Sequence, residues 1–102
     1  MTYFALINEQ GPKWNDQVEM REQKGWSEHA KFMDALEEEH FVVLGGPLRK
    51  ENSKHRTLLV FSAPNEDTIR NRLHEDPWVR DGMLRVRDIY RWEILLGRLP
   101  KE

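Results

Sequence analysis

The order of the predicted strands and helices constrains this 102-residue sequence more than any other feature. Short runs of branched and aromatic residues are typical of strands, and two longer stretches carry apolar residues at helical spacing. Strands are predicted at residues 3–7, 41–44, 57–61 and 83–96. One helix is predicted to start between residues 20 and 26 and to run to about 40, and a second helix is predicted over 66–75. A short turn is predicted over 78–82. The order β-α-β-β-α-β is that of the split βαβ, or ferredoxin-like, arrangement. The expected fold class is therefore α+β, with both helices on one face of an antiparallel sheet.

Local signals set the ends of these elements. Gly45-Gly46-Pro47 should end the second strand in a tight exit, where backbone can approach backbone or a ligand closely. Asn65 has the side chain of a helix N-cap. Pro77 disfavours the α conformation in the residue before it, so the second helix should stop near residue 75. In the last strand the apolar–polar alternation breaks at residues 88–89, which predicts a β-bulge there.

The first three predicted strands are apolar on both of their faces. An antiparallel sheet with helices on one face and water on the other normally alternates apolar and polar residues. Residues 3–7, 41–44 and 58–61 instead read Tyr-Phe-Ala-Leu-Ile, Phe-Val-Val-Leu and Leu-Leu-Val-Phe. Because no predicted element remains to cover the second face, we expect a homodimer in which the sheets of two copies face each other. The alternative is that strands this short are too brief for the alternation to carry meaning.

Length and composition bound the class of protein. A chain of 102 residues has the size of one domain, here expected to span residues 1–102. It has no apolar run near the roughly 18–20 residues of a membrane helix, and its start lacks the basic region and apolar stretch of a signal peptide. It contains no cysteine, which fits a reducing compartment, so we expect a cytoplasmic protein.

The charge distribution argues against nucleic acid as a partner. Sixteen Lys and Arg residues stand against eighteen Asp and Glu residues, for a net charge of −2. The C-terminal third is rich in arginine, but acidic residues interleave with the arginines, so no concentrated basic face is expected. We expect no nucleic-acid or membrane partner.

The first predicted helix carries a histidine on its apolar stripe. At 100° per residue, Trp26, Ala30, Met33 and Leu36 fall in one arc about 120° wide, and His29 falls inside that arc. A titratable ring that faces a core needs a hydrogen-bond partner. One interpretation is a core histidine that a backbone carbonyl satisfies. The other is a functional residue.

Asp76-Pro77-Trp78 follows the second predicted helix. The extended turn that proline imposes can direct the Asp76 carboxylate back toward the sheet, although aspartate is also an ordinary turn residue. Since both helices pack on the same face of the sheet, His29 and Asp76 can meet where the helices adjoin. A carboxylate fixes the tautomer of a histidine and supports its positive charge during proton transfer. His29 and Asp76 are therefore the candidate catalytic residues, and Met33, Gly46, Pro47 and Trp78 are the candidate substrate-binding residues.

Other kinds of catalytic site find little support in the sequence. Ser53 and Ser62 lack the context of a nucleophile elbow. The four histidines show no spacing that is typical of metal ligands, so we expect no metal site. Gly45-Gly46-Pro47 lacks the spacing and the following helix of a phosphate-binding loop, and we expect no cofactor.

Five separated motifs of the sequence resemble the YciI-like (YCII-related) family. They lie, in order, at Met20–Gln23, Trp26–Leu36, Val43–Leu48, Asp76–Met83 and Trp92–Leu96. The resemblance implies a dimeric α+β barrel of the ferredoxin-like type, with a small cleft that holds a His–Asp pair. That pair transfers here to His29 and Asp76. The best-supported chemistry in the family is a dehydrochlorinase-type elimination on a chlorinated aromatic, which would come to this chain by analogy only.

The sequence therefore predicts a small enzyme that uses no metal and performs acid–base chemistry, such as elimination or isomerisation, on a small organic molecule. His29 would move the proton and Asp76 would orient the imidazole ring. The alternative is a non-catalytic ligand-binding or regulatory module in which His29 only donates a hydrogen bond to a bound metabolite. A haem- or oxygen-handling barrel is a third interpretation, which the lack of a recognisable cofactor motif disfavours.

Overall fold

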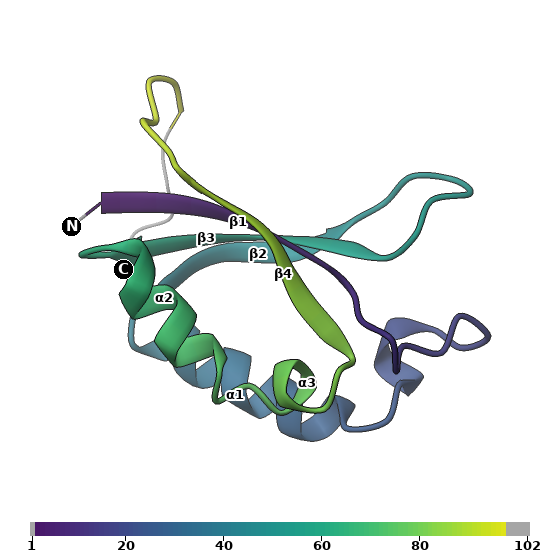
Figure 1. The fold of residues 1–102 in the computed structure, drawn as a ribbon. Coiled ribbons are helices and arrows are strands. Elements are labelled where there is room, and N and C mark those ends of the chain that lie inside the picture. The colour runs from purple at the N-terminus through teal and green to yellow at the C-terminus, as the bar shows by residue number, and fades with distance from the viewer. Residues whose placement is uncertain (1, 98–102) are drawn as a thin grey trace.

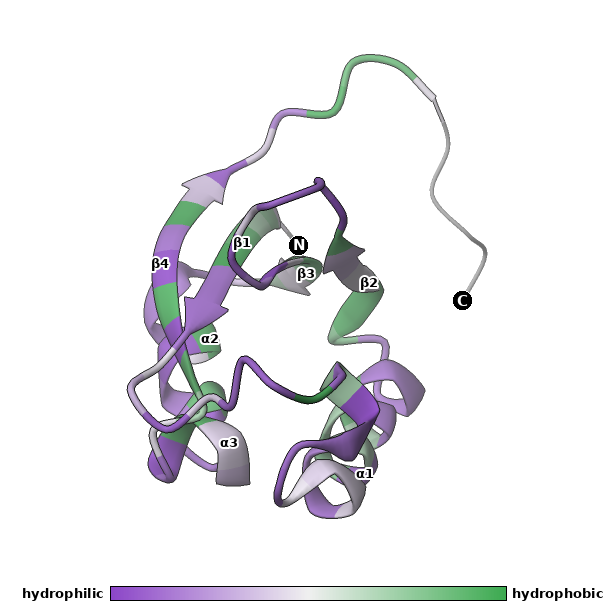
Figure 2. Cartoon of the chain, turned by 90° about the vertical axis from the view of Figure 1, so that its right-hand side faces the viewer, coloured by the Kyte–Doolittle hydropathy of each residue, from purple (hydrophilic) through white to green (hydrophobic). Residues whose placement is uncertain are grey.

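The computed structural model describes residues 2–97 and has the predicted order of strands and helices. The strands are β1 (Thr2–Gln10), β2 (Val42–Leu48), β3 (Arg56–Ala63) and β4 (Leu84–Arg91), and the helices are the 3₁₀ turn η1 (Met20–Glu22), α1 (Trp26–Glu38), α2 (Glu66–Leu73) and α3 (Pro77–Arg80). The strands form one antiparallel sheet in the order β2-β3-β1-β4. All the helices lie on one face of this sheet (Figures 1 and 2). The α+β, ferredoxin-like prediction is confirmed.

A hydrophobic core between the sheet and the helices fixes their relative positions. Alternate residues of the central strands face it, including Phe4 and Leu6 of β1 and Phe61 of β3. They pack against Leu36 of α1 and Ile69 of α2, and both of these side chains are fully buried. Burial of a side chain of this size contributes roughly 1.5–3 kcal/mol, so the packed stripe of each helix determines which of its faces meets the sheet.

Residues close by in the sequence determine where α1 begins and ends and where α2 begins. Asn65 caps α2, since its side-chain oxygen accepts a hydrogen bond from the backbone N–H of Thr68 at 2.9 Å, as predicted. His40 has a φ of 61°, and the N–H of Phe41 donates to the carbonyl of Leu36, which closes the end of α1 in a Schellman motif. Gly25 begins α1 with a φ of 81°.

Several strand boundaries differ from the prediction, and β1 runs on to Gln10 instead of ending at Ile7. β2 continues through Gly45-Gly46-Pro47 to Leu48, so the prediction that it ends before these residues was wrong. β2 is an edge strand that pairs only with β3, and an edge strand tolerates a proline because only one side of the strand needs partners. β4 ends at Arg91 because Arg91 pairs with Phe4, near the start of β1, and little of β1 remains beyond that point to pair with.

The predicted bulge in the last strand is present next to the expected position. The pairing between β1 and β4 shifts between Ile7 and Asn8, so that Arg87 is the extra residue of β4. As a result Val86 and Ile89 both face the helices, while Tyr90 faces the opposite side. No helix covers this second face of the sheet (Figure 2). Leu44, Leu48 and Tyr90 are exposed on it, and Tyr90 retains 58% of its accessible surface.

Within residues 2–97, no helix is long and apolar enough to cross a membrane.

Candidate functional site

The carboxylate of Asp76 is fixed by the turn between α2 and α3. Asp76 is the N-cap of α3 and Pro77 is the first helical residue, a position where proline loses no hydrogen bond. One carboxylate oxygen, Oδ1, accepts a hydrogen bond from the backbone N–H of Trp78 at 3.0 Å. Asp76 is only 1% exposed, so this cap holds a buried carboxylate in a single orientation.

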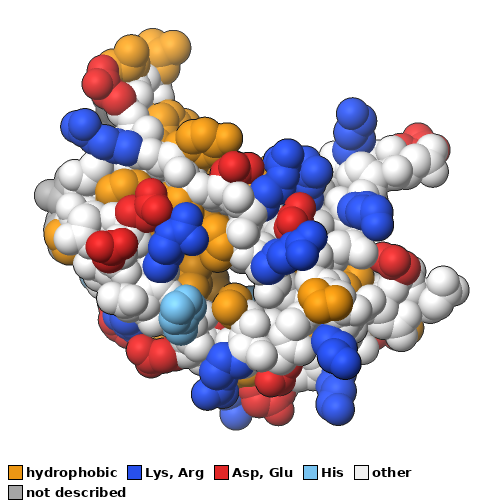
Figure 3. All heavy atoms as spheres, in the orientation of Figure 1, with side chains coloured by type: hydrophobic (Ala, Val, Ile, Leu, Met, Phe, Trp, Pro, Cys, Tyr) orange, Lys and Arg blue, Asp and Glu red, His pale blue; other side chains and the backbone are white. Residues whose placement is uncertain are grey.

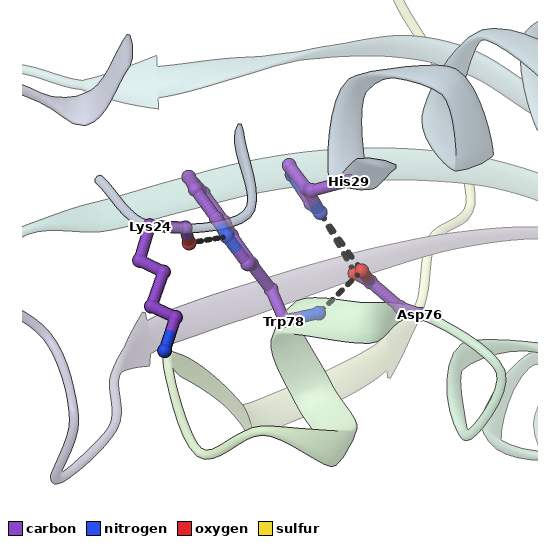
Figure 4. Close-up of polar contacts among 4 residues, drawn as sticks. All are labelled: Lys24, His29, Asp76 and Trp78. Carbon is purple, nitrogen blue, oxygen red and sulfur yellow. Dashed lines mark hydrogen bonds and ion pairs between the residues drawn. The ribbon is translucent and has the colours of Figure 1, made fainter. Parts of the chain in front are cut away.

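His29 reaches this carboxylate from the first turn of α1. Its Nδ1 lies 2.9 Å from Oδ1 and 3.0 Å from Oδ2 of Asp76, although 47 residues separate the two in the sequence (Figure 4). His29 is 9% exposed. The expected approach of the two side chains to hydrogen-bonding distance is therefore found. The partner of the histidine is a carboxylate, and the alternative of a backbone carbonyl is wrong.

Trp78 holds the His29 ring from one side. The two rings are stacked, with centroids 4.1 Å apart and planes 9° from parallel. The indole is itself fixed, because its Nε1 donates to the carbonyl of Lys24 at 2.8 Å (Figure 4). A Cβ on Gly25 would lie 3.2 Å from the same Nε1, and the φ of this residue is positive. The turn before α1 therefore favours glycine on two grounds, its conformation and its close approach to Trp78.

The arrangement distinguishes the two nitrogens of His29. Nδ1–H donates to the carboxylate, which leaves Nε2 with the free lone pair. Nε2 has no hydrogen-bond partner within residues 2–97, and it is not among the nitrogen and oxygen atoms that are buried from solvent without a partner. This nitrogen is free to accept a proton.

A cavity of about 280 Å³ lies in front of the ring, between α1 and the edge strand β2. His29 lines it, whereas Asp76 does not and stands behind the ring. All four candidate substrate-binding residues line the same cavity: Met33, Gly46, Pro47 and Trp78. Most other lining side chains are apolar, including those of Trp26, Leu59 and Leu84. The space suits a small, mainly apolar molecule.

The family model for the YCII-related domain matches residues 1–93. The chain belongs to the YCII-related family. The resemblance that the five sequence motifs carry is thereby confirmed.

Solved structures with a similar fold include a dehydrochlorinase. It is the 5-chloro-2-hydroxyhydroquinone dehydrochlorinase TftG from Burkholderia phenoliruptrix AC1100, in complex with 2,5-dihydroxybenzoquinone. The TM-score is 0.66, and the alignment covers 89% of this chain and 93% of that chain at 16% sequence identity. Similarity at this level of identity shows a shared fold. No curated protein matches the sequence.

Asn8 is a polar residue of this YCII-related site that sequence reasoning missed. It is 3% exposed, lines the cavity, and its Oδ1 is buried without a hydrogen-bond partner among residues 2–97. The predicted first strand stopped at Ile7 and left Asn8 in a loop. Had the strand been extended, the two-residue period from Phe4 and Leu6 would have placed Asn8 on the helix-covered face.

The described residues of this YCII-related protein contain no group of three His, Cys, Asp or Glu side chains that could hold a metal ion.

Proposed function

We propose that this protein is a small enzyme that needs no bound cofactor. His29 exchanges a proton with a small organic substrate, and Asp76 positions the imidazole ring and stabilises the positive charge that the ring gains. One observation carries the proposal. The His29 ring is held on its Nδ1 side by a buried carboxylate, while its Nε2 side meets an apolar cavity. A pair that served only stability would gain nothing from a free nitrogen beside a cavity.

Each contact of His29 has a role in proton transfer. When Nε2 accepts a proton, the ring becomes an imidazolium, and the Asp76 carboxylate 2.9 Å away stabilises the new charge. The face of Trp78 adds a cation–π contribution from its stacked position at 4.1 Å. Both groups are in place before the reaction, so neither has to reorganise during it.

The reaction class that we propose is elimination, with isomerisation as a related case. Nε2 takes a proton from the substrate, and the electron pair of that broken bond forms a new π bond. The leaving group departs with the electron pair of its bond to carbon. The net loss of HX transfers no electrons to another reactant, so it needs no oxidant or reductant. Structural similarity to a dehydrochlorinase supports hydroxylated, halogenated aromatics as the first substrates to test.

Asn8 gives this site a means to orient the substrate. Its unpartnered Oδ1 is an acceptor that costs roughly 1–3 kcal/mol while it remains buried without a donor. A hydroxyl or N–H group of the substrate would satisfy it. Asn8 therefore favours substrates that carry a donor beside the proton that His29 removes.

The test is turnover across a panel of chlorinated and unchlorinated hydroxyarenes that includes 5-chloro-2-hydroxyhydroquinone, with chloride release as the readout. Asp76→Asn should slow release by at least about 10²-fold. Asp81→Asn is the matched control, because Asp81 is an exposed carboxylate that lines no part of the cavity. Binding of panel members without any turnover by the wild-type protein would favour the alternative, a ligand-binding module in which His29 is only a hydrogen-bonding group.

We also propose that two copies pair through the uncovered face of the sheet. Leu44, Leu48 and Tyr90 are exposed on this face, and Trp92 follows directly after β4. Monomeric proteins rarely expose several large apolar side chains together on one face, so such a cluster indicates an interaction surface. A second copy presents the same surface, which is the requirement for a two-fold symmetric interface.

A further inference from the structure

A second cavity, of about 230 Å³, adjoins the one that His29 faces. Met20 and Pro47 line both cavities, so they lie where the two cavities meet. The second cavity lies between the β2–β3 hairpin and the segment that leads into η1. Its lining differs from that of the first, because most of the side chains around it are charged or polar.

Three cations of the hairpin line this second cavity: Arg49, Lys50 and Lys54. None of them forms an ion pair with any residue from 2 to 97. Figure 3 shows Lys and Arg side chains gathered toward the end of the molecule that carries this hairpin. Two carboxylates, Asp16 and Glu19, also line the cavity. The charged side chains around it therefore carry a net positive charge even when His55 is neutral.

His55 provides a second, independent indication of a missing ligand. Its ring stacks on Trp14, with centroids 4.2 Å apart and planes 14° from parallel. Its Nε2 is buried and has no hydrogen-bond partner within the described chain. Burial, followed by the charges of Arg49 and His29, lowers the pKa of His55 below its ordinary value. A neutral ring with an unsatisfied nitrogen beside unpaired cations is the environment that an anion would complete.

We propose that the second cavity binds an anionic group of the substrate, a carboxylate or a phosphate, while the reacting apolar part of the same molecule occupies the first cavity beside His29. This inference rests on the proposed function, since it defines the substrate class of the same site. Arg49 and Lys54 neutralise the anion, and the ring of His55 turns against Trp14 so that its buried Nε2 donates a hydrogen bond to the anion. Met20 and Pro47 lie beside the middle of the molecule, between its anionic end and its reacting end.

Binding of three probes with a common phenyl group tests this proposal without any need for turnover. They are 3-phenylpropionate, 2-phenylethyl phosphate and the uncharged 3-phenylpropanamide. NMR titration, followed at the ring signals of His55 and Trp14, gives a dissociation constant for each probe. We expect at least one anion to bind about 10-fold more tightly than the amide, a difference near 1.4 kcal/mol, and the preference to shrink as salt is raised. Whichever anion binds more tightly identifies carboxylate or phosphate as the natural group.

The double variant Arg49→Gln/Lys54→Gln should reduce this preference to less than about threefold, since it removes two of the three cations. The control Lys31→Gln/Arg80→Gln removes one lysine and one arginine that are exposed and line neither cavity, and it should keep the full preference. All four side chains are exposed, so both variants should fold normally, which circular dichroism checks.

The proposal is overturned if both anions bind no more tightly than the amide, if the hairpin variant keeps the preference, or if the control loses it equally. It is also overturned if no probe shifts the His55 and Trp14 signals up to roughly 20 mM, where even weak binding would be seen. Asp76→Asn should retain the preference, because Asp76 lines neither cavity. If the wild-type protein shows the preference but turns over no member of the chloride-release panel, the catalytic proposal is contradicted and the anion site stands.

Discussion

Replacing Asp76 by alanine and by asparagine should have different effects on stability, because the carboxylate has two structural partners. It caps α3 through the N–H of Trp78 at 3.0 Å, and it accepts from Nδ1 of His29 at 2.9 Å. Loss of an N-cap costs about 1 kcal/mol. Loss of a buried hydrogen bond to a charged group costs roughly 1.5–3 kcal/mol. Asp76→Ala should therefore lower the free energy of unfolding by about 2.5–4 kcal/mol, a large share of the roughly 5–15 kcal/mol of a small domain.

Asp76→Asn should cost less. The amide oxygen can still cap α3, and the amide NH₂ group can donate to Nδ1 of His29 once the imidazole carries its proton on Nε2 instead. We expect a loss of about 1–2 kcal/mol, the value of exchanging a charged hydrogen bond for a neutral one. The folded variant would then hold the imidazole in the tautomer that has no lone pair on Nε2.

Urea unfolding, followed by tryptophan fluorescence, measures both changes. Trp78 contacts both Trp14 and Trp26 around the site, so tryptophan emission reports on the loss of the site. With a slope of about 2 kcal/mol/M, Asp76→Ala should shift the midpoint by roughly 1.3–2 M and Asp76→Asn by roughly 0.5–1 M. Protein concentration must be held constant, because a dimer unfolds in a concentration-dependent way. Equal losses in the two variants, within about 0.5 kcal/mol, would refute the assigned cap and hydrogen bond.

Three further predictions concern residues around the site and the sheet. Gly25→Ala should lower the free energy of unfolding by about 1–2 kcal/mol, because Gly25 has a φ of 81° and an added Cβ would lie 3.2 Å from Nε1 of Trp78. Thermal melting measures this loss, and an unchanged melting temperature would contradict the prediction. Because burial and Arg49 lower the pKa of His55 below 6.5, the unfolded chain binds that proton at higher pH than the folded chain, so stability should fall as pH decreases below about 6.5. His55→Asn should lose this part of the pH dependence, and urea titrations with the same slope in variant and wild type would argue against it. Light scattering at micromolar concentration should give twice the chain mass of 12.2 kDa, and a mass of one chain would reject pairing through the sheet.

The sequence allowed the fold and the approach of two side chains to be predicted because local signals agreed with the global arrangement. The helical spacing of His29 relative to Met33 and Leu36 placed its ring on the packed face of α1, and Pro77 fixed the backbone that carries Asp76. These signals act over a few residues, so they can be read without the rest of the chain.

Features that depend on tertiary neighbours could not be predicted in the same way. β2 passes through Gly45-Gly46-Pro47 because it lies at the edge of the sheet, and strand order is not visible in a local pattern. The predicted strand continues to residue 96, but β4 ends at Arg91, and beyond it Trp92 still donates a backbone hydrogen bond to Tyr3 near the start of β1. The stacking of Trp78 on His29 and the unpartnered oxygen of Asn8 arise from residues that are distant in the sequence.

His29 and Asp76 should act as one catalytic unit, and a double-mutant kinetic cycle measures the coupling between them. With a substrate from the chloride-release panel, kcat is measured for the wild type, His29→Gln, Asp76→Asn and the double variant. Each single substitution should lower kcat by about 10²–10⁴-fold. The double variant should be no slower than the slower single variant, because residues that act as a unit are not additive. A kcat within about threefold of the wild type in either correctly folded single variant, or losses that multiply in the double variant, would contradict the claim.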